Sequence, residues 1–227
     1  LSRQVYRNFS NFDSYTGVFS VNREFNMLDD EDLGTFNSTF VPSVTAFRVF
    51  LQGEELLRSH RAEIDWKTTL IDQGSFGLNV YFDERDFIGS LDKTGAILGV
   101  GLSRSIVFPK SGIFLSYKTN FEHFYANSDV QTYIKRSFDV STRQGINSST
   151  FASTSINYSE KDYEASDPLL GLRTDKGLSL RLGLTKVLNL CWNADMGVTF
   201  SNNKSSIGLY ERSNEGLAVK FNYLCTE

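Results

Sequence analysis

The chain has 227 residues, of which 40% are hydrophobic and 14% aromatic, with 23 basic against 27 acidic side chains and a formal net charge of −4. This composition excludes a disordered acidic tail, and it excludes a general nucleic-acid binder, because neutralising phosphates requires a surplus of Lys and Arg. No stretch approaches the roughly 20 apolar residues of a helical membrane span. Leu1 is not followed by a basic and then apolar leader, so we expect a mature or trimmed chain.

The first fifty residues give the weakest strand signals. We expect a first strand within Arg3–Ser10, a second near Tyr15 and a third over Phe36–Leu51. The acidic segment Asp29–Asp32 is predicted to be a solvated loop. Pro42 interrupts the third of these runs, and a proline within a strand indicates a bulge or a sheet edge.

From His60 onward, apolar and polar residues alternate regularly. Between His60 and Leu70 the even-numbered positions are mostly apolar, whereas the odd-numbered positions from 61 to 67 are all charged. A period of two is typical of a β-strand with two unlike faces. The further runs start near Phe76, Ala96, Gly112, Val130, Thr150, Leu178, Cys191 and Glu215.

The length of these runs favours a membrane barrel. They alternate over roughly 9–11 residues, which is what a tilted strand needs to cross a bilayer, whereas strands of soluble sandwiches are usually about 5–6 residues long. Short connections also alternate with longer ones, as outer-membrane barrels require. The short ones are 71–75, 109–112, 144–148 and 187–190, and the longer ones are 83–93, 125–129, 160–176 and 201–212.

Aromatic residues near the ends of the apolar faces are typical of an interfacial belt. These are Tyr117, Phe121, Trp192, Phe200, Phe221 and Tyr223. We therefore predict an all-β fold, a closed antiparallel transmembrane up-and-down β-barrel of about 12 strands, with 10 to 14 as the range, in the bacterial outer membrane. The alternative is a soluble barrel or sandwich. Residues 1–227 are predicted to form a single domain.

The charged faces of these strands are predicted to line the interior. The predicted pore-lining residues are Arg61, Glu63, Asp65, Lys67, Lys118, Glu122, Lys135, Asp139, Arg143, Arg181, Asp195 and Lys220. Such a mixture of signs has two interpretations: a water-filled pore without strong ion selectivity, or charges that pair across the lumen and close it.

Two arginines break this pattern by falling on apolar faces. Arg104 is near enough to the turn at Pro109 to extend to the membrane interface. Arg136 is in the middle of its run, which suggests a bulge or a protein neighbour.

The last third of the chain carries a more particular pattern. Its components are the segments 158–163 (YSEKDY), 173–175 (RTD), 201–203 (SNN), 205–207 (SSI) and 210–212 (YER). This pattern resembles the C-terminal end of the outer-membrane barrels of surface lipoprotein assembly modifiers and of related polysaccharide-export proteins. The resemblance implies that the Arg-x-Asp sequence begins a descending strand and that the Ser-Asn segment lies in the last outer loop. The chain departs from that family in lacking its helical repeats and in ending on Glu227 instead of an aromatic residue.

Three residues of this pattern, Arg173, Asp175 and Tyr210, are predicted to make loop contacts. For these residues we favour loop packing and a salt bridge over a role in substrate binding.

Sequence signals for catalysis or cofactor binding are weak. With two cysteines and two histidines, the chain lacks the ligands of a zinc or haem site, so no metal and no cofactor are predicted. His123 next to Ser128 or Asp129 could form a hydrolytic site, but a polar rim residue is the favoured interpretation, and the chain is predicted not to be an enzyme. Cys191 and Cys225 fall on opposite faces by parity, so we expect free thiols.

The predicted function is a pore or translocation channel for a polar solute, a polymer or an exported chain. Its partners are predicted to be outer-membrane lipid and, if the barrel belongs to a larger complex, other envelope proteins; no nucleic acid is expected. The alternatives are a non-conducting scaffold barrel that anchors an envelope assembly and, less favoured, an outer-membrane hydrolase.

Overall fold

The computed structural model describes the backbone of residues 2–5, 12–16, 25–28, 36–51, 54–70, 74–189 and 192–223. Within these ranges the chain is almost entirely β-structure. Three short strands are β1 (Ser2–Val5), β2 (Phe12–Thr16) and β3 (Phe25–Leu28). The predictions for Cys191, for Cys225 and for the acidic segment 29–32 lie outside the described residues.

Ten long strands of 12 to 17 residues follow the three short ones. They are β4 (Phe36–Leu51), β5 (Glu54–Leu70), β6 (Gly74–Phe87), β7 (Gly95–Phe108), β8 (Ile113–Ala126), β9 (Tyr133–Asn147), β10 (Thr150–Tyr163), β11 (Thr174–Val187), β12 (Trp192–Ser205) and β13 (Arg212–Tyr223). The 3₁₀ turns η1 (Leu91–Lys93), η2 (Asp129–Gln131) and η3 (Gly208–Tyr210) lie in three of the connections.

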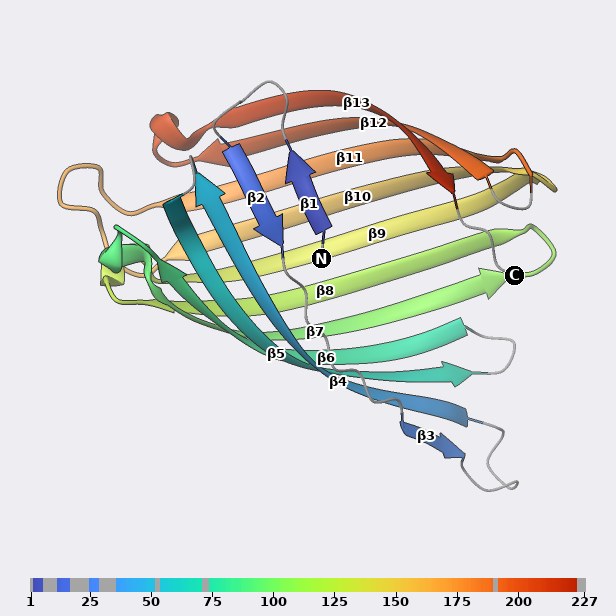
Figure 1. Cartoon of the computed structure of the whole chain (residues 1–227), viewed down its shortest axis with the longest axis horizontal. Helices are drawn as coiled ribbons and strands as arrows, with labels where there is room; N and C mark the ends of the chain where they lie inside the picture. The colour runs from blue at the N-terminus through green and yellow to red at the C-terminus, as the bar shows by residue number, and fades with distance from the viewer. Residues whose placement is uncertain are drawn as a thin grey trace.

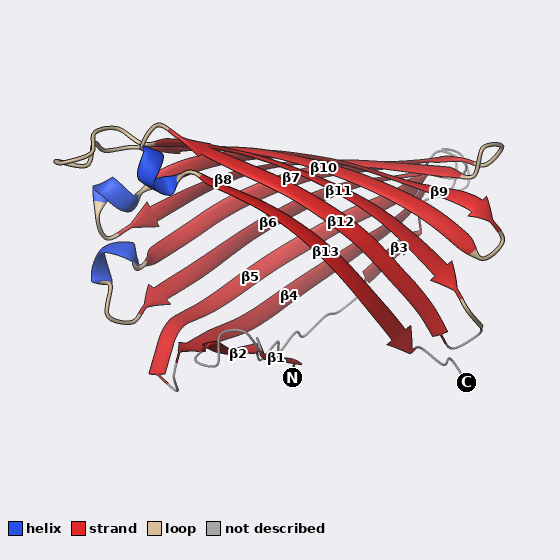
Figure 2. Ribbon diagram, turned by 90° about the horizontal axis from the view of Figure 1, so that it is seen from above, coloured by secondary structure: helices blue, strands red, loops and turns tan. Residues whose placement is uncertain are grey.

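All strands belong to one antiparallel sheet in which each long strand pairs with its neighbours along the chain (Figure 1). The predicted all-β, up-and-down arrangement is therefore confirmed. The longer connections, which carry the three 3₁₀ turns, gather at one end of the sheet, called the loop rim here, and the short turns that follow β5, β7, β9 and β11 gather at the other end. The sheet is curled into a trough, and its two outermost long strands, β4 and β13, approach the same side (Figure 2).

The prediction of a closed barrel is not met within the described ranges. No pairing there joins β13 back to the first strands, so the sheet has two ends. The alternation of a strand reports which of its faces is apolar, but closure depends on strand tilt and stagger, which the alternation does not encode. The estimate of about 12 similar strands is also replaced by ten long and three short ones, because a strand as short as β3 offers too few residues for a period to be visible.

The stretch around Pro42 was predicted to be a bulge or an edge, and the structure makes it an edge. β4 continues through Pro42, which is paired with Ile64 of β5. On its other side β4 pairs with β3 up to Phe40 and with β2 at Phe50 and Leu51, and no described strand pairs with residues 41–49. A proline is tolerated there because its missing N–H would face no partner.

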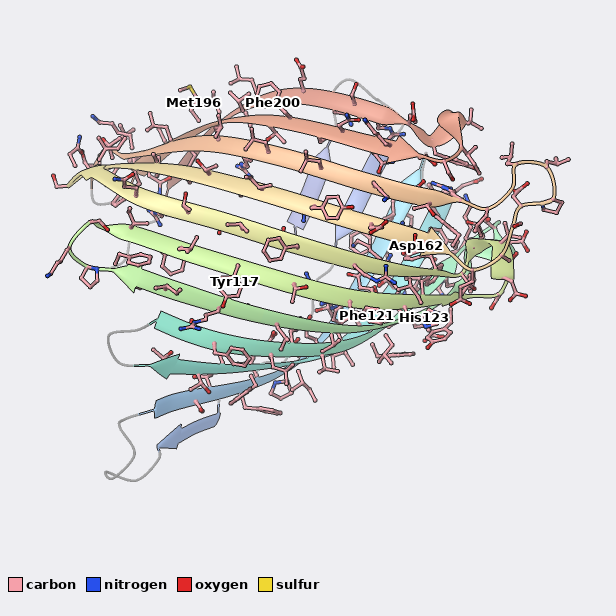
Figure 3. The ribbon with its side chains drawn as sticks, turned by 180° about the vertical axis from the view of Figure 1, so that it is seen from behind. Tyr117, Phe121, His123, Asp162, Met196 and Phe200 are labelled. Carbon is pink, nitrogen blue, oxygen red and sulfur yellow. The ribbon has the colours of Figure 1, made fainter. Side chains whose placement is uncertain are left out.

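The two faces of the sheet differ in polarity, and the exposed one is apolar. Along β6, Phe82 is 49% exposed, whereas Asp83 next to it is only 2% exposed. The residues paired with Phe82 and Asp83 on β7 are Leu98, which is 52% exposed, and Ile97, which is 2% exposed. We call the concave side, which carries Asp83, the inner face, and the opposite side the outer face (Figure 3).

A small buried cluster lies on the inner face near the loop rim. It consists of Tyr81, Ile97 and Phe124, from β6, β7 and β8. Tyr81 lies across Gly99, because a Cβ atom built on that glycine would be 2.2 Å from the Cζ atom of the tyrosine ring. Gly99 therefore provides the space that the tyrosine ring occupies.

Replacing Gly99 by alanine is expected to lower the free energy of unfolding by about 1–3 kcal/mol, because the added methyl group forces the Tyr81 ring out of place. The measurement is equilibrium unfolding in urea. Gly216→Ala is the matched control, since a Cβ atom there meets nothing within 4 Å. Equal stability of the two variants would contradict the packing described here.

Candidate functional site

The twelve residues predicted to line a pore all occupy the inner face. Cross-strand partners share a face, so the register extends the assignment from Asp83 of β6 to every other long strand. It pairs Arg61 with Asp83, Glu122 with Lys135, and Asp195 with Lys220. The remaining positions assigned in this way are Glu63, Asp65, Lys67, Lys118, Asp139, Arg143 and Arg181. Whether they line a pore stays a prediction.

Carboxylates on this face, both the buried Asp83 and the exposed Asp65, accept hydrogen bonds from their own or a neighbouring strand. The Oδ1 atom of Asp83 accepts a hydrogen bond from the Ser59 hydroxyl at 2.5 Å, and its Oδ2 atom accepts one from Nε of Arg85 at 2.8 Å. Asn79 donates to Oδ1 of Asp65 at 2.7 Å. A buried charge is stable only when it is paired in this way, so the inner face is organised as a polar network.

A second network links β5, β6, β8 and β9. The Tyr81 hydroxyl donates to Oε1 of Glu122 at 2.6 Å, and the Lys135 ammonium group lies 3.1 Å from the other oxygen of that carboxylate. The Arg61 guanidinium lies 3.8 Å from the centroid of the Tyr81 ring and forms an ion pair with Glu63. Tyr81 thus connects the buried cluster to the charged face.

The ion pairs on the inner face are all local. Among the residues whose side chains the structure describes, each pair joins residues of one strand, of neighbouring strands, or of one strand and its adjoining loop. None of these pairs spans the trough. Of the two interpretations of the mixed charges, pairing across the lumen therefore has no example in the described residues.

At the loop rim, Arg173 is fixed on three sides. Its guanidinium makes two hydrogen bonds to Asp175, of 3.0 Å and 2.6 Å, and lies 3.4 Å from the centroid of the Tyr210 ring and 4.6 Å from that of Tyr163. Burial, the largest single effect, would lower the pKa of Arg173, but the hydrogen bonds to Asp175 and the electrostatic attraction of Tyr163, Asp175 and Tyr210 together outweigh it and raise this pKa above its ordinary value. The structure thus brings together the three residues predicted to make loop contacts.

Sequence reasoning missed the aromatic wall beside Arg173. Tyr163 lies 5.5 Å from Tyr133 and Tyr133 lies 5.1 Å from Phe124, measured between ring centroids. Lys161 places its ammonium group 4.1 Å from the Tyr133 centroid. The odd-numbered residues in 157–163 continue the alternation of β10 and could have indicated this wall. The predicted connection 160–176 is wrong at its start, because β10 continues to Tyr163.

Charged residues on the outer face gather near the loop rim. Arg136 forms a 3.2 Å ion pair with Asp162, which Figure 3 labels, and Lys176 forms a 3.0 Å pair with Glu160. The register of β9 with β10 is continuous at Arg136, so the suggested bulge is wrong. The partner of Arg136 is Asp162, on the neighbouring strand β10. Arg104 is on the outer face, paired in register with Tyr117.

His123 does not form the hydrolytic arrangement considered above. It lies on the outer face at the loop rim (Figure 3), where its Nε2 atom is 2.7 Å from Glu164 and its ring is 3.8 Å from that of Tyr125. The structure gives it no contact with the side chain of Ser128 or Asp129.

Two further properties concern only the residues that the structure describes. No group of three or more His, Cys, Asp or Glu side chains there could hold a metal ion. The helical segments are single 3₁₀ turns, too short to cross a membrane.

Comparison with known proteins gives a structural likeness but no family. No protein-family model matches the chain, and no curated protein matches it. The crystal structure of the ferric yersiniabactin uptake receptor FyuA from Yersinia pestis is similar over 89% of this chain and 41% of that chain, with 12% sequence identity and a TM-score of 0.34. The chain thus spans less than half the length of that receptor. The resemblance to surface lipoprotein assembly modifiers has no counterpart in these comparisons.

Replacing Asp175 by asparagine is expected to lower the free energy of unfolding by about 1–3 kcal/mol, because Arg173 stays partly buried and loses its charged acceptor. Unfolding in urea measures this. The control is Glu160→Gln, which removes the ion pair of exposed Lys176 and should cost clearly less than the Asp175 variant, because solvent screens exposed pairs. A larger loss in the control would mean that Arg173 does not organise the rim.

Proposed function

We propose that the chain forms a closed transmembrane β-barrel in the bacterial outer membrane and acts as a pore or translocation channel for a polar solute, a polymer or an exported chain. The observation that carries this proposal is the inverted polarity of the sheet. Large apolar side chains cover the exposed outer face, and the hydrogen-bonded charges face inward. A sheet stable in water has the opposite arrangement, whereas a lipid-embedded barrel has this one.

The height of the apolar band supports a bilayer. On the outer face of β11, Lys176 and Lys186 flank an apolar series made only of leucines. The ten residue steps from Lys176 to Lys186 correspond to about 34 Å along the strand, and a tilt of about 45° reduces this to about 24 Å. The apolar band of outer-membrane barrels is about 25 Å tall.

Outer-membrane lipid is the partner that this face requires. Phe121, Trp192 and Phe200, three of the six aromatics predicted for the interfacial belt, are each more than 40% exposed on it. The resemblance of segment 158–212 to the end of surface lipoprotein assembly modifier barrels points to the same compartment and to envelope proteins as further partners. Closure of the sheet belongs to this proposal, because an unpaired strand edge in lipid leaves backbone groups without hydrogen bonds.

Two features of the inner face support different states of the lumen, one open and one filled by side chains. Toward the short-turn end, a cavity of about 560 Å³ is bordered by small residues, among them Gly77, Gly101 and Ser103, which supports an open pore. At the loop rim the cluster around Tyr81 fills the inner face, which supports a non-conducting scaffold barrel as the second candidate. An enzymatic role has no such support, and we propose a protein without catalytic activity.

Nitroxide labels at positions 180 and 181 test the membrane assignment. In lipid vesicles, with Cys191 and Cys225 replaced by serine, a label at Leu180 should be accessible to oxygen dissolved in lipid, and one at Arg181 to a water-soluble nickel complex. Phe138 and Asp139 of β9 form a second pair of the same design. The same water accessibility for both members of each pair would contradict the barrel.

Conductance in planar bilayers distinguishes the pore from the scaffold. The pore reading predicts steady openings with weak ion selectivity, because the inner face carries both signs of charge. Tyr81→Ala should increase the conductance by widening the inner face at the loop rim. Tyr158→Ala on the outer face, where Tyr158 is 40% exposed, should leave it unchanged. Absence of current from all three proteins would favour the scaffold.

A further inference from the structure

A cationic cavity of about 460 Å³ lies on the inner face at the loop rim. Its walls come from β9 to β12, from the turn η3 and from the residues that flank η3 and β11. Four of its lining side chains are cations, namely Lys135, Lys161, Arg173 and Arg212, against the two carboxylates of Asp175 and Glu211. Its volume falls in the range of small-molecule sites, about 300–1,000 Å³.

The positive charges of this cavity are only partly compensated from within the protein. In the register, Lys161 is directly opposite Lys135 of β9 on one side and Asp175 of β11 on the other. Like charges directly opposite each other are destabilising, and Asp175 is shared between Lys161 and Arg173. Lys135 is compensated by Glu122 and Arg173 by Asp175. Among the ion pairs of the described residues, none includes Lys161 or Arg212.

One side of the cavity is already organised for recognition. The guanidinium of Arg173 is held against the rings of Tyr210 and Tyr163, and Asp175 accepts from its Nε and one of its Nη atoms. The other Nη atom keeps its two donors for a further acceptor. Because Arg173 is fixed before any ligand arrives, binding costs little side-chain entropy.

Neutral polar groups complete the lining. Asn203 donates to the carbonyl oxygen of Tyr210, which ties η3 to β12, and its own carbonyl group can accept from a ligand. The Ser159 hydroxyl lies in the same wall. Such groups suit the hydroxyls of a polar solute, whereas the excess of four cations over two carboxylates in the lining favours negative charge.

We propose that this cavity binds a sugar-sized organic anion through an oxyanion group, a phosphate or a carboxylate, that Lys161, Arg173 and Arg212 contact. The proposal goes beyond the pore function and does not require the barrel to conduct. Its test is therefore independent of current measurements.

The experiment is isothermal titration calorimetry on the full chain in detergent, with glucose 6-phosphate, glucuronate and neutral glucose as probes. Both charged sugars should bind and glucose should not. Raising the salt concentration from 0.05 to 0.5 M should weaken binding, since screening shortens the Debye length from about 14 Å to about 4 Å. Inorganic phosphate alone should bind more weakly than glucose 6-phosphate, because it cannot use the neutral groups.

The variant Lys161→Met keeps the length of the side chain and should weaken the binding of both charged sugars at least tenfold. The matched control is Lys118→Met, which removes a cation from the same face but outside this cavity, and should leave affinity unchanged. Arg212→Gln, at an exposed residue, is a second variant and should weaken the binding of both charged sugars as well. Equal binding of glucose, no binding of either charged sugar, or equal losses in the Lys161 and Lys118 variants would overturn the proposal.

Discussion

Every feature of this molecule depends on the register of the ladder between neighbouring strands. Side chains on a strand alternate with a period of two, so a slip of one residue would turn a whole strand over and move its charges to the outer face. Ten long strands stay in phase, and the ladders between them show two irregularities, at Val49/Phe50 and at Thr150/Phe151, both near strand ends. The polarity of each face is therefore continuous from β4 to β13.

That continuity determines how charge is distributed over the sheet. Inner-face carboxylates receive hydrogen bonds from strands one or two places away in the sheet, as the Asp83 and Glu122 networks do, so charge can be buried without a partner across the trough. On the outer face, ion pairs such as Arg136–Asp162 are confined to the neighbourhood of the loop rim. Among the described residues, the outer-face ion pairs and the cationic cavity of the inner face thus lie at the same end of the sheet, the loop rim.

The same geometry explains which features could be predicted from the sequence. The face of each of the twelve charged residues followed from parity alone, because between the rims one side of every strand is apolar. Near the loop rim the difference in polarity between the two faces of a strand disappears. The sequence therefore predicts a loop where β10 ends. The partner of Arg136 could not be identified from the sequence for the same reason, because Asp162 lies in the segment predicted to be this loop. The packing of Tyr163 and Tyr210 on Arg173 could not be predicted, because it depends on how loops fold back over strand ends and leaves no period in the sequence.

The order of the strands also has a consequence for how the sheet assembles. Each long strand pairs with the strand before it and the strand after it, and the direct pairing of β2 with β4 is the one described ladder that skips a strand. Contacts between chain neighbours require only short loops to close, so their entropic cost is small. The sheet can therefore form one hairpin at a time. Each new strand pairs with a strand whose apolar and polar faces are already fixed. In the closed barrel that we propose, joining the two ends is the single long-range step, and we expect it to come last and to limit the rate.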